Sequence, residues 1–387
     1  MWRAAVSRPA IRLAAFYAAI FLVTGVQLPF WPVWLASRGL SPEEIGYLLA
    51  AAIWVKVVTT PAIGAVADRA TGHRTVMAVL AATALAAYMA LIWSSSLWLL
   101  IPLNLAAFAA QSALMPLGDS ITLAAARSEA LDYGRVRVWG SASFVLASVA
   151  SGAALTAGSG ERVIMLVAGT SAVLLISCLC VPGVRTGIGA KRRIGLGAVV
   201  RDARFWLLIG TASALQSSHQ VYYGFGTLHW RSLGFSDTAI GWLWAEGVLA
   251  EIVLFWFGRP LVARMGPVGM MALGGGASIL RWSLTGALTW LPSVVGLQLL
   301  HALTFGASQL GAMHFLSRAP TPYGAASVQS LYTALSSAIG SGVVMTLAGT
   351  LYSSYGGAAY YFMAVLSAAG LVGAVGLRAV TAENRNQ

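Results

Sequence analysis

Apolar stretches of about twenty residues recur along the whole chain, separated by short polar interruptions. A stretch of this length crosses the hydrocarbon core of a bilayer as one helix. The pattern predicts an all-α membrane protein with twelve transmembrane helices. The expected spans are residues 11–36, 44–67, 74–95, 97–126, 134–158, 161–183, 204–229, 238–262, 267–288, 292–317, 324–351 and 357–380.

Composition agrees with this pattern. The chain is 58% apolar and only 9% charged, whereas about a quarter of the residues of a soluble domain are charged. This excludes a soluble globular protein. The sequence contains no P-loop, no Gly-x-Ser-x-Gly and no His-Glu-x-x-His motif. We therefore expect no cofactor and no metal, and an ion gradient as the only energy source.

The chain carries a net charge of +12, which in a soluble protein would suggest a nucleic-acid partner. The placement of the charge gives another explanation. The loops on the side of the two termini hold most lysine and arginine residues, whereas the opposite side holds only Arg38, Arg162 and Arg231. Basic loops stay in the cytoplasm. We expect both termini in the cytoplasm, a multi-pass location in the cell inner (cytoplasmic) membrane, and no nucleic-acid partner.

The longest loop, residues 184–203, carries Lys191-Arg192-Arg193 and divides the chain into two sets of six spans. We predict an N-terminal six-helix half at 1–183, a cytoplasmic linker at 184–203 and a C-terminal six-helix half at 204–387, enclosing a central cavity. An internal echo supports a parallel repeat. Residues 38–46 and 232–241 both contain Gly-apolar-Ser, then an acid, then Ile-Gly.

Ionisable residues inside predicted spans are costly and mark functional sites. Asp119 lies well inside one helix and Arg137 inside the next, so we predict that they pair around a polar cavity. Lys56 lies near the middle of the second span and is expected to face inward. The second half has its own set, from which we predict a shared polar site: His219, Glu246, Glu251, Arg281, His301 and, near a helix end, His314.

The turn between the second and third spans resembles the loop signature of the major facilitator superfamily. A glycine, Gly64, is followed four residues later by Asp68-Arg69 and then by basic residues including Arg74. The resemblance implies a latch for one conformation, in which the glycine lets two helices approach and Asp68 meets basic groups. The chain departs from the signature at His73, where a basic residue is usual. A merely solvated charged turn is the alternative.

Nearly the whole chain resembles the phenylpropionate-permease group of this superfamily and, more distantly, the proton-coupled lactose permease. The most specific passages are residues 133–141, 233–236, 251–257 and 300–307. The resemblance implies that Arg137, paired with Asp119, holds the substrate. It also implies that Arg281, His301 and a glutamate couple substrate to protons, and the glutamate is Glu251 or Glu246, with Glu251 favoured.

One departure bears on the coupling. The lactose permease has a proton-carrying glutamate three residues after the histidine, and this chain has Thr304 there. The proton site must then lie elsewhere, at Glu251, Glu246, Asp119 or His301, unless coupling differs. We hypothesise that Glu251 is protonated when substrate loads from outside and releases its proton inside as Arg281 draws closer.

The charge balance inside the spans favours an anionic substrate. Three cations face two or three acids, and with one acid protonated the site is net positive. An arginine can hold a carboxylate with two parallel hydrogen bonds. Aromatic residues expected to line the site are Trp139, Phe144 and Tyr222. These observations predict a proton-coupled symporter of a small organic anion such as an aromatic carboxylate, working by alternating access.

Other readings stay open at this point. A sugar or nucleoside remains possible as the substrate, since the lactose-permease residues are present too. A channel or a membrane-embedded enzyme is a more remote alternative, because the ionisable residues are spread over both halves at mid-span depth. The expected partners are a small-molecule substrate, protons and the lipid bilayer, and the protein is expected to be a monomer.

Overall fold

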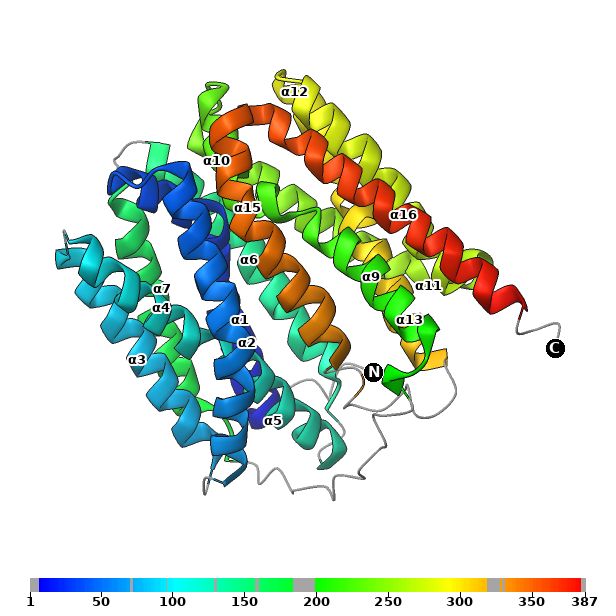
Figure 1. The fold of residues 1–387 in the computed structure, drawn as a ribbon. Coiled ribbons are helices and arrows are strands. Elements are labelled where there is room, and N and C mark those ends of the chain that lie inside the picture. Colours follow the sequence, from blue (N-terminus) through cyan, green and yellow to red (C-terminus); the bar gives the residue numbers. More distant parts are fainter. Residues whose placement is uncertain are drawn as a thin grey trace. The chain divides into compact units, whose positions relative to one another are not determined.

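The structure is a computed structural model of the 387-residue chain. It describes residues 7–69, 72–94, 96–128, 131–156, 160–183, 199–318, 328 and 331–383. Within these residues every regular element is a helix (Figure 1). The prediction of an all-α protein is confirmed for this part of the chain.

The helices before residue 184 are α1 (Arg8–Ser37), α2 (Pro42–Arg69), α3 (His73–Trp93), α4 (Leu97–Ser112), α5 (Leu114–Ser128), α6 (Tyr133–Thr156) and α7 (Arg162–Cys180). Those after residue 198 begin with α9 (Ala203–Ser217), α10 (Gln220–Ser232), α11 (Asp237–Ala287) and α12 (Leu291–Leu299). They continue with η2 (Ala302–Ala307), α13 (Ser308–Arg318), η3 (Thr333–Ile339), α15 (Gly340–Tyr355), η4 (Gly356–Ala358) and α16 (Ala359–Glu383).

The chain divides into two compact units. Unit 1 comprises Met1–Leu40, Trp54–Lys191 and Ser236–Ala245. Its central helix is α1, which packs against α6 and α7, while α3 packs against α4 and α7. The α1–α6 contact is close because a side chain at Gly25 would lie 2.7 Å from the Phe144 carbonyl oxygen. Small residues allow this approach between helices in a membrane.

Unit 2 comprises Ser41–Ile53, Arg192–Phe235 and Glu246–Gln387. Here α9 packs against α16 and η3, and α10 packs against α15. An apolar core of the unit lies between α9, α11, α13 and α16 and includes the fully buried residues Phe205, Leu208 and Met271. Gly370 and Gly373 on α16 let α9 come close, since added side chains would meet Leu215 and Thr211 below 3 Å.

Each unit includes a short segment from the other side of the predicted linker, and both segments carry the echoed Ile-Gly pair. In unit 2, a side chain at Gly46 would lie 2.7 Å from the Cα atom of Gly349. In unit 1, a side chain at Gly241 would lie 2.4 Å from the Ser148 carbonyl oxygen, and Gly152 is beside it. The echo in the sequence therefore corresponds to one repeated feature, a glycine that allows two helix backbones to touch.

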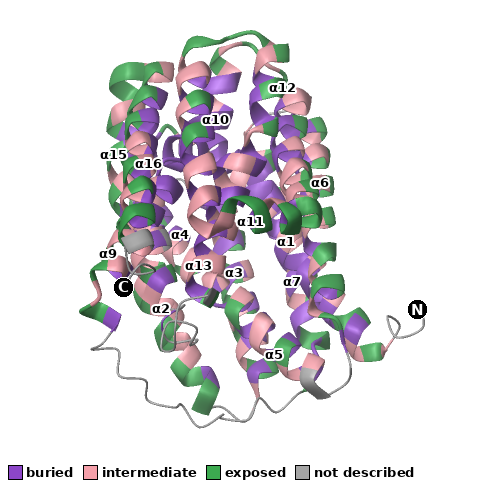
Figure 2. Cartoon of the chain, turned by 90° about the vertical axis from the view of Figure 1, so that its right-hand side faces the viewer, coloured by how far each residue is buried: buried purple, intermediate pink, exposed green. Residues whose placement is uncertain are grey.

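Large apolar residues are exposed on many helices, and Figure 2 marks exposed positions along the helices in green. Trp98 is 87% exposed, Val372 71% and Val365 70%. Apolar surface of this extent marks contact with a membrane. Within the described residues, nine helices are long and apolar enough to cross a bilayer.

The difference between these nine helices and the twelve predicted spans has local causes. Asp237–Ala287, at 51 residues, covers two predicted spans, and it changes direction at Gly266, whose φ of 71° suits glycine. Thr333–Thr381 likewise covers two. The seventh predicted span is divided at His219, between α9 and α10. The count of twelve and the division into halves stay predictions, and most of the predicted linker, residues 184–198, lies outside the described residues.

Candidate functional site

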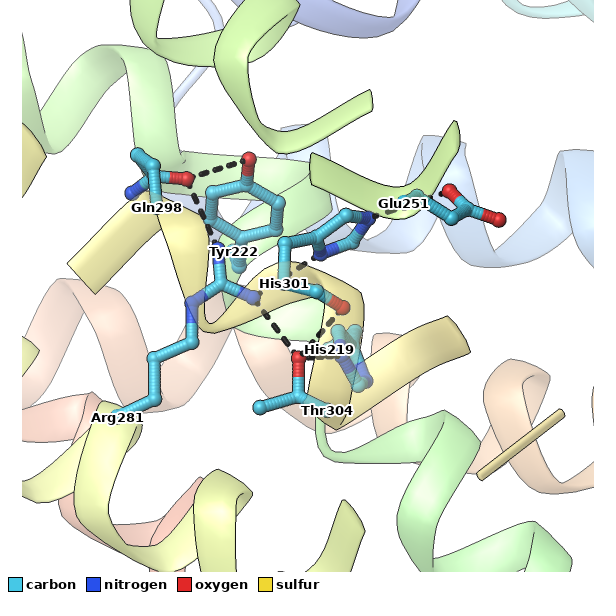
Figure 3. Close-up of polar contacts among 7 residues, drawn as sticks. All are labelled: His219, Tyr222, Glu251, Arg281, Gln298, His301 and Thr304. Atoms are coloured by element: carbon cyan, nitrogen blue, oxygen red, sulfur yellow. Dashed lines mark hydrogen bonds and ion pairs between the residues drawn. The ribbon is translucent and has the colours of Figure 1, made fainter. Parts of the chain in front are cut away.

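Arg281 is the centre of a polar cluster in unit 2 (Figure 3). It lies on α11 and is fully buried. Its Nη1 atom is 3.0 Å from Nδ1 of His301 and donates to Oγ1 of Thr304 at 3.1 Å, and its Nη2 atom donates to Oε1 of Gln298 at 2.9 Å. All three acceptors are neutral. No carboxylate among the described residues lies within salt-bridge distance of Arg281.

Two aromatic rings complete the surroundings of the guanidinium. Its Cζ atom lies 4.5 Å from the ring centroid of Trp282 and 4.8 Å from that of Tyr222. Each contact is a cation–π interaction of about 0.5–2 kcal/mol. Tyr222 also donates its hydroxyl to Gln298 at 3.1 Å. Buried charges need such partners because desolvation costs several kcal/mol, so the cluster holds Arg281 charged with neutral groups alone.

The contact with Arg281 determines the protonation of His301. A guanidinium can only donate, so Nδ1 of His301 must accept. The neutral ring then carries its proton on Nε2, which is 4.0 Å from Oε2 of Glu251 on α11 (Figure 3). A proton added to Nδ1 would face the Arg281 donor and break that hydrogen bond. His301 can therefore gain a proton only if Arg281 moves away.

Thr304 links Arg281 to His219. Nδ1 of His219 contacts the Leu215 carbonyl oxygen at 3.1 Å and must donate to it. In the neutral ring, Nε2 is then an acceptor, and it lies 3.1 Å from the Thr304 hydroxyl oxygen. Thr304 can thus accept from Arg281 and donate to His219 at the same time. The structure brings together Arg281, His301 and His219 of the predicted polar site, and the role of that site stays a prediction.

The backbone is irregular at both ends of this contact. Thr304 lies in η2, a π-helical segment at Ala302–Ala307. His219 lies at the break between α9 and α10. Single π-helical turns inside α-helices occur frequently at functional sites. Thr304, which contacts Arg281, and His219, which contacts Thr304, therefore both lie on irregular backbone.

Unit 1 has a second polar cluster around Asp119 on α5. Two phenol groups donate to its Oδ1 atom, Tyr17 at 2.6 Å and Tyr133 at 3.0 Å. Tyr17 also contacts the Thr122 hydroxyl at 3.3 Å. The expected ion pair between Asp119 and Arg137 is absent from the described contacts. The expectation of direct pairing was wrong in this structure, where two neutral donors contact Oδ1 of Asp119 in place of the guanidinium.

Arg137 on α6 lies against aromatic rings instead. Its Cζ atom is 4.2 Å from the ring centroid of Phe21 and 5.5 Å from that of Tyr17. Among the described residues it has no hydrogen-bond partner and no ion pair. The side chain is half-buried. Arg137 therefore presents a planar cation with unused donors, which is the geometry that binds a carboxylate with two hydrogen bonds.

The other expected substrate and coupling residues are not joined to either cluster by polar contacts. Lys56 on α2 is exposed and has no hydrogen bond or ion pair within the described part of the chain. Glu246 on α11 is half-buried and likewise has neither. Trp139 is 58% exposed on α6, whereas Phe144 is buried beside Gly25. Their expected roles stay predictions.

The predicted latch differs from its expected geometry. A side chain added at Gly64 would meet no atom within 4 Å, so this glycine does not bring helices together here. Asp68 instead lies 3.9 Å from Nε2 of His73, the residue that departs from the signature. Arg69 and Arg74 are exposed. His73 therefore takes the place of the expected basic partner, and the latch role itself stays a prediction.

Sequence reasoning missed Tyr17, Phe21 and Tyr133 at Asp119 and Arg137, and Gln298 at Arg281. A signal existed for Gln298, since Gln298, His301 and Thr304 recur at intervals of three and form one polar stripe on a helix. For the aromatic residues of the first span, the only signal was that Tyr17 and Phe21 are four residues apart and so lie on one face of a helix. Nothing local indicates that this pair faces a helix about a hundred residues away.

Comparisons with known proteins agree with this architecture. The model of the MFS_1 like family matches residues 10–364. The "Probable 3-phenylpropionic acid transporter" of Escherichia coli (strain K12) is 30% identical over 368 residues, covering 92% of this chain and 94% of that protein. The "Maltose permease" of Geobacillus stearothermophilus is 26% identical, covering 96% of this chain and 94% of that protein.

A solved structure shares the fold. The crystal structure of the nucleoside transporter NupG superposes with a TM-score of 0.82 at 16% sequence identity, covering 96% of this chain and 99% of that one. The resemblance to major facilitator transporters expected from the sequence is thereby confirmed. The chain is a multi-pass membrane transporter and not an enzyme, and it belongs to the MFS_1 like family of the major facilitator superfamily.

Proposed function

We propose that this transporter is a proton-coupled symporter of a small organic anion, an aromatic carboxylate, and that it works by alternating access. The observation that carries the proposal is Arg137, which lies on an aromatic ring without any hydrogen-bond partner among the described residues. Phe21 supports the guanidinium from one side, and its donors remain unused. An aromatic carboxylate offers two oxygens to such a guanidinium and a ring for apolar contacts. A relative that is 30% identical is named as a probable 3-phenylpropionic acid transporter, which supports the same substrate class.

Coupling to protons is assigned to unit 2. His301 lies between Glu251 and Arg281, and its neutral form is needed for the hydrogen bond from Arg281. We propose that Glu251 carries the proton when substrate loads from outside. It releases the proton inside, as Arg281 draws closer to it. The termini are proposed to be cytoplasmic and the protein to reside in the inner membrane, as the distribution of basic loops indicates.

Uptake into proteoliposomes tests the function. Labelled 3-phenylpropionate should accumulate when an inward proton gradient is imposed, saturate with concentration, and fail to accumulate when a protonophore collapses the gradient. The amide of the same acid, which has the ring but no charge, should neither be taken up nor compete. Uptake that does not saturate and ignores the gradient would indicate a channel and contradict the proposal.

Glu251→Gln isolates the coupling step. This change mimics the protonated acid, so the variant should still exchange 3-phenylpropionate across the membrane but fail to accumulate it against a gradient. Glu246→Gln, five residues earlier on α11, tests the other acid of the same helix. Full accumulation in Glu251→Gln together with its loss in Glu246→Gln would move the role to Glu246.

A sugar or nucleoside is the second candidate substrate, and the names of two related proteins favour it. One sequence relative is a maltose permease and one structural neighbour is a nucleoside transporter. In the same proteoliposomes, gradient-driven uptake of maltose or uridine without uptake of 3-phenylpropionate would establish this alternative.

A further inference from the structure

Helix α1 offers two aromatic residues, one turn apart, to the acid and the base of unit 1. Tyr17 donates its hydroxyl to Asp119 at 2.6 Å, and Phe21 lies under the guanidinium of Arg137 at 4.2 Å. Residues four apart lie on the same face of a helix. One face of α1 therefore contacts the Asp119 carboxylate through Tyr17 and the Arg137 guanidinium through Phe21.

On helix α6, a residue that contacts Asp119 is also one turn from Arg137. Tyr133 donates to Asp119 at 3.0 Å, and Arg137 is four residues later on the same helix. The ring of Tyr17 is itself 5.5 Å from the Arg137 guanidinium. Arg137 therefore lies one turn from Tyr133 on α6 and beside the ring of Tyr17 on α1, both of which contact Asp119, yet it does not pair with the acid.

Gly140 on α6 leaves space for the contact between Phe21 and Arg137. A side chain at Gly140 would lie 2.8 Å from Cδ2 of Phe21 and 3.1 Å from Nη1 of Arg137. The guanidinium is thus packed between Phe21 and the backbone of its own helix, one turn further along. A larger residue at position 140 would overlap the Phe21 ring and crowd the guanidinium.

We propose that Tyr17, Tyr133 and Phe21 are positioning residues that set the specificity of the transporter by keeping Asp119 and Arg137 apart. The two phenols supply neutral donors to Oδ1 of Asp119, and the Phe21 ring stabilises the cation without using its hydrogen bonds. Arg137 stays available to a substrate carboxylate that would otherwise compete with an internal ion pair. This inference rests on the proposed transport of an organic anion and names the residues that tune its site.

A test without ligand uses the reaction of arginine with phenylglyoxal. The full-length protein in detergent is treated with the reagent, and modification of each arginine is followed over time by mass spectrometry of its peptides. In Tyr17→Phe/Tyr133→Phe, Asp119 loses both donors and should capture Arg137. The modification rate at Arg137 should then fall about tenfold, the effect of an ion pair of ~1.4 kcal/mol.

Two controls separate this effect from a general disturbance. Arg135, which is 3.6 Å from Asp132 and 58% exposed in its side chain, should react at an unchanged rate in every variant. Tyr88→Phe removes another buried hydroxyl of unit 1, one that contacts Gln27 and Gln111 instead of Asp119. It should leave the rate at Arg137 unchanged.

A triple variant tests whether the Asp119 charge causes the slower modification of Arg137. Adding Asp119→Asn to the double tyrosine variant removes the competing charge and should restore the Arg137 rate to within about twofold of the wild type. A purely structural role of the tyrosines would give no such restoration. An unchanged rate in Tyr17→Phe/Tyr133→Phe, or a reduced rate that Asp119→Asn does not restore, would overturn the proposal.

The affinity for 3-phenylpropionate should change in parallel with the modification rate at Arg137. It should fall about tenfold in the double tyrosine variant and recover when Asp119→Asn is added. A wild-type protein that binds no 3-phenylpropionate, with the phenylglyoxal pattern as expected, would contradict the proposed substrate. It would leave the separation of Asp119 and Arg137 established. The two failures are therefore distinguishable.

Discussion

Arg137 in unit 1 and Arg281 in unit 2 are both arginines on membrane helices stacked against aromatic rings, but they use their donors differently. Arg281 is fully buried and donates to three neutral side chains. Arg137 is half-buried and donates to none of the described residues. Both terminal nitrogens of Arg281 are engaged in a fixed network, although its buried Nε atom has no partner among the described residues. A guanidinium whose terminal nitrogens are unused can take a ligand. We therefore assign substrate binding to Arg137 and coupling to the network around Arg281.

Asp119 in unit 1 and Glu251 in unit 2 also differ in their partners. Asp119 accepts two phenol hydrogen bonds on one oxygen and stays apart from its arginine. Glu251 lies 4.0 Å from His301, which in turn contacts Arg281. An acid linked to an arginine through a titratable ring can transmit a proton change, and one held by phenols cannot. The comparison predicts that changes at Arg281 affect folding and coupling, while changes at Arg137 affect binding.

The largest expected effect is that of Arg281→Ala on stability. The change leaves Gln298, His301 and Thr304 without their shared donor in a buried site. Breaking a buried charged cluster costs about 3–5 kcal/mol, so thermal unfolding followed by tryptophan fluorescence should shift strongly downward. Arg137→Ala should shift it little, because no described hydrogen bond is lost. Equal shifts of the unfolding temperature in Arg281→Ala and Arg137→Ala would contradict the different roles of the two arginines.

The next effect concerns binding by Arg137. Arg137→Lys keeps the charge but loses the planar pair of donors. Affinity for 3-phenylpropionate should fall about a hundredfold, or ~2.7 kcal/mol, while the unfolding temperature stays near that of the wild type. Titration calorimetry of the purified protein measures the first quantity. Affinity close to the wild-type value would remove Arg137 from the site.

Thr304→Val sharpens the comparison on the side of unit 2. Valine keeps the shape of threonine but cannot bridge Arg281 and His219. Leaving two buried groups unsatisfied should cost about 1–3 kcal/mol of stability. Thr304→Ser retains the hydroxyl and serves as the matched control. If both variants unfold at the same temperature, the bridge contributes nothing to the fold.

The smallest effect is expected at Phe21. Phe21→Leu removes a cation–π contact worth about 0.5–2 kcal/mol while keeping the apolar volume. Arg137 then loses its support, and 3-phenylpropionate should bind several-fold more weakly. Phe21→Tyr keeps the aromatic face and should bind as the wild type does. Binding unaffected by Phe21→Leu would show that the ring does not position the guanidinium.

Much of the fold was predictable because the length of an apolar stretch is a direct consequence of the thickness of a bilayer. The long helices α1 and α7 begin and end close to their expected limits. The break at His219 was missed, because apolarity continues across it and shows only that a segment is long enough to span. The π-helical turn at Thr304 was missed for the same reason.

The site was predictable in its arginine and histidine residues and not in its aromatic and amide residues. Arg281 and His301 stand out in a chain with few charges, and the structure brings them together. Tyr17 and Phe21 lie in the first apolar span, where an aromatic residue has many possible roles. Whether a phenol contacts Asp119 depends on tertiary packing between α1 and α5, which no local pattern contains.

The most direct test of the central claim is the affinity of the purified wild-type protein for a carboxylate and for its neutral amide. Titration calorimetry would be run with 3-phenylpropionate and with 3-phenylpropionamide under identical conditions. If Arg137 offers its unused donors to a substrate anion, the carboxylate should bind at least about a hundredfold more tightly, since each of the two charged hydrogen bonds contributes about 1.5–3 kcal/mol. Equal affinities for the two compounds, or binding of neither, would contradict the account.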